Sequence, residues 1–66
     1  MHLRINGEPQ EFGNIHTIAD LIDALQLDMR QVAIEQNRRI ITRSAHAHTP
    51  IEDGDHIEIV EFIGGG

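Results

Sequence analysis

The first residues of the chain alternate between polar and apolar positions. In the segment MHLRIN (1–6) every second residue is apolar, and this two-residue period predicts a strand with one buried face. The following NGEP supplies a turn, because Gly7 accepts positive φ and Pro9 fixes its own φ. We expect a second short strand in QEF (10–12), which would complete a hairpin.

The period changes to that of a helix at Ile18. Apolar residues now recur at spacings of three and four, at Ile18, Leu21, Ile22 and Leu25. This spacing places them on one stripe of a helix, which we expect to face the core. Thr17 and Asp20 have the spacing of a capping box, with Asp in place of the usual Glu. The helix is therefore predicted to begin just after Thr17.

Three further strands are predicted in the second half of the chain. VAIEQN (32–37) and RRIITR (38–43) form a hairpin joined at Asn37-Arg38, and HIEIVEFI (56–63) forms the last strand. Between them SAHAHTPIEDGD (44–55) is predicted to be a polar loop that ends in an Asp-Gly turn. One helix and five short strands indicate an α+β fold, a small mixed sheet with the helix packed on it.

The alternation breaks within the last strand. Val60, Phe62 and Ile63 cannot all point to the same side as Ile57 and Ile59 on a regular strand. Either a bulge restores the phase or part of this apolar set is exposed. If it is exposed, these residues form an apolar patch of the kind that anchors a protein interface; alternatively, Phe62 covers one end of the core.

Composition limits what such a chain can do. Its 66 residues form one domain at most, and the formal net charge is −6, with five arginines and no lysine. An acidic chain without a basic stripe is repelled by nucleic acid and by anionic membranes, so we expect neither as a partner. No apolar run is long enough to span a membrane, and we expect a cytoplasmic protein. The absence of cysteine excludes thiol chemistry and disulfides.

The end of the sequence consists of three consecutive glycines, Gly64, Gly65 and Gly66. Such a run is typical of a frayed terminus. It is also the thinnest thread that a polypeptide can present, and three extended residues reach about 10 Å. That is far enough to carry a carboxylate into a narrow active site of a partner. We therefore divide the chain into a domain at 1–63 and a flexible tail at 64–66.

Other candidate groups carry weaker signals. His46 and His48 stand two residues apart, but a metal site needs three or four converging ligands, and we expect no metal. Arg38, Arg39 and Arg43 form a short basic cluster that is either a solvated face or part of a docking surface. No nucleophile, acid pair or cofactor-binding motif is recognisable, so the chain is not expected to be an enzyme.

Two stretches of the sequence resemble a known family. VAIEQNRRIITRS and TPIEDGDHIEIVEFIGGG are similar to the ThiS family of sulfur carriers from thiamine biosynthesis. The resemblance implies a β-grasp, ubiquitin-like fold in which the first and last strands pair centrally. It also implies that Gly66 is adenylated by a ThiF-like enzyme, which uses ATP and Mg, and is then converted to a thiocarboxylate. The carrier itself would bind no cofactor.

The same resemblance implies the remaining partners and roles. A sulfur donor such as a cysteine desulfurase would supply the sulfur, and thiazole synthase, ThiG, would consume it. Gly64 and Gly65 would thread the tail into the partner. From the broken alternation and the basic cluster, we expect Val60, Phe62, Ile63 and Arg43 to contribute to docking. The sequence departs from the family at Asn37-Arg38, often Asn-Gly, at Thr42, often Pro, and at His46, often Trp. These departures concern loop packing more than the chemistry of the tail.

Three other functions remain open from the sequence. The chain could carry sulfur for another pathway, such as that of molybdopterin or cysteine. It could be a protein modifier that is joined through Gly66 to lysines of its targets. It could also be a non-covalent interaction module, which would not need Gly65 and Gly66.

Overall fold

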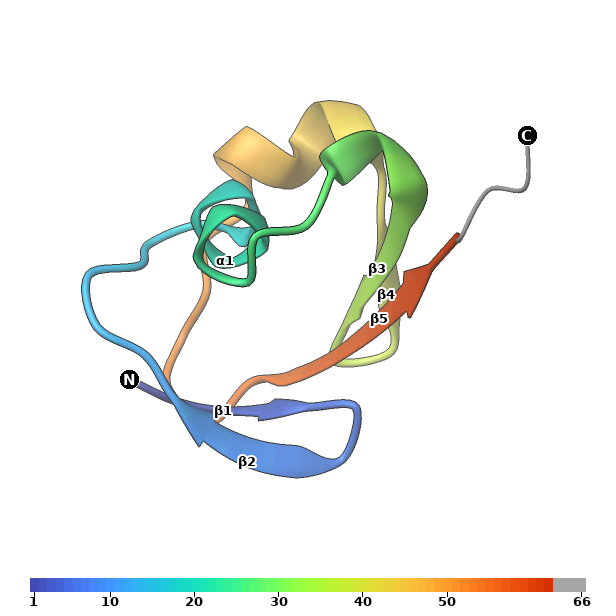
Figure 1. Cartoon of the computed structure of the whole chain (residues 1–66). Coiled ribbons are helices and arrows are strands. Elements are labelled where there is room, and N and C mark those ends of the chain that lie inside the picture. Colours follow the sequence, from blue (N-terminus) through green and yellow to red (C-terminus); the bar gives the residue numbers. More distant parts are fainter. Residues whose placement is uncertain (63–66) are drawn as a thin grey trace.

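The computed structural model describes residues 1–62 of the chain. They form a five-stranded sheet in the order β2-β1-β5-β3-β4, with one α-helix and two 3₁₀ helices over one side (Figure 1). The elements are β1 His2–Ile5, β2 Glu8–Glu11, α1 Ile18–Ala24, η1 Met29–Gln31, β3 Val32–Gln36, β4 Arg39–Ile41, η2 Arg43–His48 and β5 His56–Glu61. The predicted α+β class and element order are thus confirmed. Ile63 and Gly64–Gly66 lie outside the described residues, as does the proposed boundary between domain and tail.

The first hairpin forms where the alternation predicts it, but its second strand begins earlier. Asn6 and Gly7 both have positive φ, at 52° and 85°, which is the geometry of a tight two-residue hairpin turn. Pro9 therefore lies inside β2 rather than in the turn. It is paired with Arg4 on an edge strand, at a position whose missing N–H would point away from β1.

The predicted capping box is present at the start of α1. Thr17 Oγ1 accepts a hydrogen bond from the Asp20 N–H at 3.2 Å, and Asp20 Oδ2 accepts from the Thr17 N–H at 3.0 Å. A backbone hydrogen bond from His16, followed by the one from Thr17, lowers the pKa of Asp20. These bonds satisfy backbone donors that a helix start leaves unpaired.

The core lies between the sheet and the helices. It is aliphatic throughout and takes residues from β1, α1, β3, β5 and two connecting segments: Leu3, Ile5, Ile15, Ile18, Leu21, Ile22, Ile34, Ile51 and Ile57. The predicted stripe of α1 supplies three of these residues, and Leu25 packs against them while partly buried. The helix face is therefore core, as its period indicates.

The segment predicted to be a polar loop contains a 3₁₀ helix instead. η2 spans Arg43–His48 and packs against α1, and within it His46 is buried. The expectation failed because the sequence of this segment has no apolar period. His46 is buried because it contacts α1 and η1, which are distant from it in the sequence.

Candidate functional site

The last described strand, β5, lies at the centre of the sheet. β5 pairs in parallel with β1, through Arg4–His56 and Ile5–Ile57, and antiparallel with β3 along its whole length up to Glu61. The Phe62 N–H then donates a hydrogen bond to the Gln31 carbonyl at 2.7 Å. The main chain is thus held by hydrogen bonds as far as the last described residue.

A side chain continues the pairing of β5 where β1 ends. Asn6 Oδ1 accepts from the Ile59 N–H at 2.7 Å, and Asn6 Nδ2 donates to the Ile59 carbonyl at 3.1 Å. The amide therefore takes the place of a backbone neighbour. Sequence reasoning assigned Asn6 only to a turn, because nothing local reveals a partner 53 residues away.

The other end of β5 is anchored by a buried carboxylate. Asp55 accepts hydrogen bonds from Gln36 Nε2 and the Glu52 N–H at 2.9 Å and from Asn37 Nδ2 at 3.0 Å. Burial raises the pKa of Asp55, but the hydrogen bonds from Asn37, Glu52 and Gln36 outweigh it, so the pKa lies below its ordinary value. Asp55 is thus ionised and ties the start of β5 to the β3–β4 hairpin.

The DGD sequence forms the predicted turn and also holds the first strand. Asp53 Oδ1 accepts a hydrogen bond from the His2 N–H at 2.6 Å, and the Gly54 N–H donates to the His2 carbonyl at 2.6 Å. Gly54 has a φ of +88°, which a residue with a side chain rarely adopts. The motif therefore fixes the relative position of the two central strands.

The break in alternation within β5 is resolved by exposure, without a bulge. Pairing with β3 is continuous from Ile57 to Glu61, so Val60 points away from the core and is 56% exposed, with Phe62 at 55%. The alternative in which Phe62 covers the core is wrong. An apolar surface on the outer face of the sheet remains, as the sequence allowed.

Two residues that the sequence did not single out extend this surface. Ala33 lies opposite Val60, and Ile40, which is 78% exposed, lies opposite Glu35. A shallow hollow of about 140 Å³ between them is bordered by Glu35 and Glu58. We call Ala33, Ile40, Val60 and Phe62 the outer-face patch. Strand register brings Ala33 and Ile40 next to Val60, which no local sequence signal predicts.

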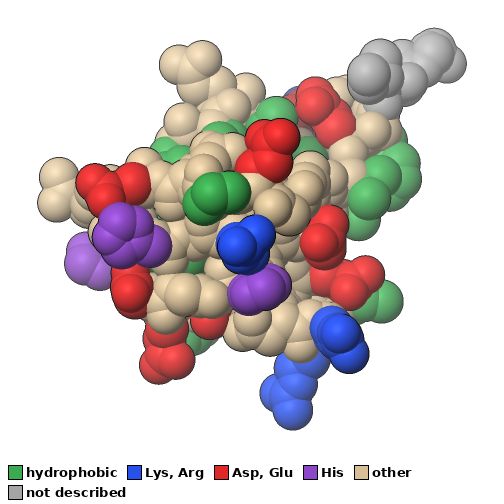
Figure 2. Space-filling model, turned by 90° about the horizontal axis from the view of Figure 1, so that it is seen from below, with side chains coloured by type: hydrophobic (Ala, Val, Ile, Leu, Met, Phe, Trp, Pro, Cys, Tyr) green, Lys and Arg blue, Asp and Glu red, His purple; other side chains and the backbone are tan. Residues whose placement is uncertain are grey.

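The three arginines do not form one cluster. Arg38 and Arg39 lie at the β3–β4 turn, whereas Arg43 begins η2 beyond the opposite end of β4. Arg43 instead reaches η1, where its guanidinium lies 3.4 Å from the Arg30 carbonyl. Basic side chains are likewise scattered among acidic ones on the face seen in Figure 2. Of these three arginines, Arg43 is therefore the one that reaches η1, whose Gln31 carbonyl accepts the hydrogen bond of the Phe62 N–H.

The other predicted site residues differ in what the structure says of them. His46 is buried and His48 is exposed, and among residues 1–62 no three His, Asp or Glu side chains converge as metal ligands. Ile63, Gly64, Gly65 and Gly66 lie outside the described residues, and their roles stay predictions. No helix in the described part is long and apolar enough to cross a membrane.

Comparison with known proteins gives a consistent family. The ThiS family model matches residues 3–66. The sulfur carrier protein ThiS of Bacillus subtilis is 37% identical over 65 residues, covering 97% of this chain and 98% of that protein. A solved structure of the thiamine biosynthesis protein ThiS from Geobacter metallireducens has a TM-score of 0.83, with 32% identity and full coverage of both chains. The predicted β-grasp, ubiquitin-like fold is thereby confirmed.

Longer relatives carry a different name. A thiazole synthase of Paramagnetospirillum magneticum is 46% identical over all 66 residues, and one of Magnetococcus marinus is 33% identical. The chain spans about a fifth of the length of these two proteins.

Proposed function

The chain belongs to the ThiS family, and on this basis we propose that it is a sulfur carrier for formation of the thiazole of thiamine. The body holds β5, the strand that precedes the tail, at the centre of the sheet. Partner enzymes perform the chemistry on Gly66. The observation that carries the proposal is the match to the family along the chain up to residue 66.

The proposed reaction has two steps, both catalysed by partners. A ThiF-like enzyme with ATP and Mg joins the Gly66 carboxylate to AMP, as an oxygen attacks the α-phosphorus and pyrophosphate leaves. Hydrosulfide, or its equivalent from a cysteine desulfurase, then attacks the acyl carbon, and AMP leaves with its oxygen. If the donor is a persulfide, a further thiol is oxidised to a disulfide as the sulfur–sulfur bond breaks. The product is a terminal thiocarboxylate.

We propose ThiG as the acceptor of this sulfur. Support comes from the two relatives named thiazole synthase, each of which contains a segment similar to this whole chain. A protein that includes both parts keeps carrier and synthase together, which suits a thiocarboxylate that must reach one enzyme. The same observation favours thiamine over the other sulfur pathways. We also propose a cytoplasmic location, where we expect these partner enzymes.

We propose the outer-face patch as the docking surface, together with Ile63 and Arg43. An exposed apolar group bordered by charged residues is typical of a protein interface. Val60 and Phe62 lie at the end of β5 from which the tail continues. A partner bound there is positioned to receive Gly64–Gly66.

The proposal is tested by intact-mass spectrometry. The chain is incubated with the adenylating enzyme from the same genome, ATP, Mg and sulfide. We expect the mass to rise by the difference between one sulfur and one oxygen atom, with the change located at Gly66. A chain that lacks Gly66 serves as the control and should not react. No mass change in the full chain, with an enzyme that is active on its own carrier standard, would contradict the proposal.

A further inference from the structure

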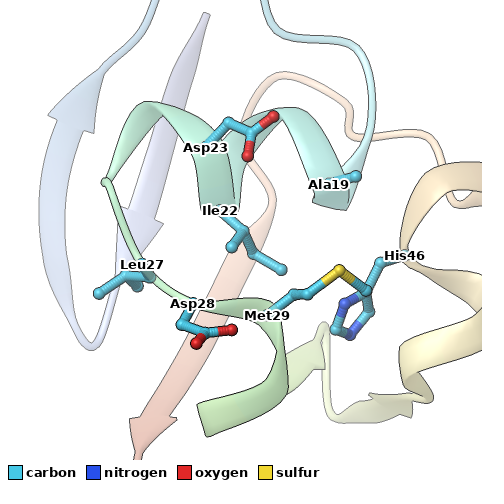
Figure 3. Close-up of a pocket in the computed structure, with 7 residues that line it drawn as sticks. All are labelled: Ala19, Ile22, Asp23, Leu27, Asp28, Met29 and His46. Atoms are coloured by element: carbon cyan, nitrogen blue, oxygen red, sulfur yellow. The ribbon is translucent and has the colours of Figure 1, made fainter.

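A second hollow lies on the opposite side of the sheet from the outer-face patch. It has a volume of about 330 Å³ and opens between α1, η1 and η2 (Figure 3). Its lining consists of Ala19, Ile22, Asp23, Leu27, Asp28, Met29 and His46. The volume is within the range of pockets that bind small organic groups. We call it the α1–η1 pocket.

His46 gives this pocket an unpaired hydrogen-bonding group. The residue is 2% exposed, and its Nε2 lies 3.3 Å from the Ile41 carbonyl oxygen. Because a carbonyl oxygen can only accept, Nε2 carries the proton, and in the neutral ring Nδ1 then has a free lone pair. Within residues 1–62 no group donates to the buried Nδ1. Buried polar atoms are normally paired, so this one calls for an explanation.

The pocket's other polar groups are acceptors too. Asp28 is held by Arg30, whose backbone N–H, Nε and NH2 groups donate to it at 2.9–3.2 Å. Asp23 is exposed at the rim and is not engaged by that guanidinium. Figure 3 shows the Met29 side chain between Asp28 and the His46 ring, with its thioether reaching towards the ring; Ile22 lies on the α1 side, and Leu27 lies on the far side of Asp28. A ligand that fits must therefore have an apolar stem and a cationic, hydrogen-bond-donating end.

An arginine side chain matches these demands better than a lysine. Its planar guanidinium carries five donors and is weakly hydrated, so it can donate to a buried acceptor, while the negative rim carboxylate favours its charge. Its methylene stem can lie along Ile22, Leu27 and the flexible Met29. The net charge of −6 attracts such a group from a distance.

The pocket lies beside the residues that hold the end of β5. Met29 lines it, and Gln31, two residues later in the same 3₁₀ helix, accepts the hydrogen bond of the Phe62 N–H. A protein that receives the tail is thus brought next to η1. We propose that the α1–η1 pocket is a second docking site for that protein and that it takes one of its arginine side chains. This inference rests on the proposed carrier function for the identity of the partner.

The pocket itself is tested with a small probe and NMR. n-Propylguanidinium is titrated into the full chain, with the neutral n-propylurea as the matched compound. We expect the guanidinium to shift the His46 Nδ1 resonance and the amides of residues 19–29, and the urea to bind more weakly. Asp23→Asn should weaken guanidinium binding by about two- to fivefold, as for one exposed charge pair. Equal binding of both compounds, or an Nδ1 resonance that does not respond, would mean that the pocket holds only water.

The docking role is tested by calorimetry with the adenylating enzyme. Asp23→Asn and the pocket-filling Ala19→Leu should bind the enzyme more weakly than the wild type, by a few-fold and by tenfold or more respectively. Glu52→Gln removes one exposed acidic charge elsewhere and should bind like the wild type. Equal affinity of all four chains would overturn the docking site and leave the carrier function standing. If the wild type itself does not bind, the carrier function fails, whereas the probe titration still reports on the pocket.

Discussion

Ile57 and Val60 stand three residues apart on β5 and face opposite sides of the sheet. Ile57 is fully buried beneath α1, whereas Val60 is 56% exposed on the other side. Both are aliphatic, and both are paired with β3 in the same register. In this protein we expect burial on one face to stabilise the fold, and we propose that the exposed apolar residues on the other face bind a partner. Four predictions test this division.

The largest effect is expected from truncating the buried side. Ile57→Ala removes three methyl or methylene groups from a closed core, and such changes cost about 2–5 kcal/mol. Val60→Ala is the matched change on the outer face and should alter the free energy of unfolding by no more than about 0.5 kcal/mol. Urea denaturation of both variants measures the contrast. Similar losses would show that the outer face also supports the fold.

Lowering the pH should reduce the stability that Asp55 contributes at the start of β5. The folded pKa of Asp55 lies below its ordinary value of 3.8, so its ionised form contributes stability above that pH. The contribution is lost as the pH falls through the lower folded value. Asp55→Asn should cost about 1–3 kcal/mol near neutral pH, because it weakens hydrogen bonds to a charged acceptor.

The pH dependence separates this effect from a general loss of stability. Below pH 4 the wild type should approach Asp55→Asn, so that the difference between their free energies of unfolding shrinks. Glu52→Gln, on the same turn, controls for the loss of one charge. A constant difference between wild type and Asp55→Asn from pH 6 to pH 2 would exclude the role assigned to this carboxylate.

Polar substitution on the outer face should affect binding and not folding. Phe62→Ser is expected to weaken affinity for the adenylating enzyme by more than about 1 kcal/mol, the loss typical of an aromatic anchor at an interface. Its unfolding midpoint should stay close to that of the wild type, because Phe62 is 55% exposed. Calorimetric titration gives the affinity. If Phe62→Ser and wild type bind equally, the patch is not the docking surface.

The smallest effect is a gain, at the hairpin that carries Ile40 of the patch. Asn37 and Arg38 have φ values of 50° and 71°, and an L-residue other than Asn or Gly is strained there. Arg38→Gly should stabilise the chain by up to about 1 kcal/mol, because it relieves this strain. Arg39→Gly, in the adjoining strand, should destabilise it. Thermal unfolding of the pair checks the sign, and a loss in Arg38→Gly would contradict the assigned turn.

Local sequence determined much of the architecture. The spacing of Ile18, Leu21 and Ile22 and the Thr17–Asp20 pair predicted α1 and its first residue, because helix period and capping depend on neighbours within one turn. Alternation likewise predicted β1, turn chemistry predicted the first hairpin, and the second was predicted from two strands that meet at Asn37-Arg38. The glycine tail and the resemblance pointed to Gly66 as the reactive end. That assignment stays a prediction, since Gly66 lies outside the described residues.

Tertiary structure decided the features that depend on distant partners. Pro9 lies in β2 because that strand is at the edge of the sheet, and Asn6 pairs with Ile59, which follows it by 53 residues. His46 is buried only because η2 packs on α1. Arg43 and Arg38 lie apart because β4 separates them. Hydrophobic periodicity is set by residues that are close in the sequence, but burial and contacts between distant residues arise only when separate segments pack together. The sequence therefore determined the five strands and α1, and the fold decided the two 3₁₀ helices and which side chains meet.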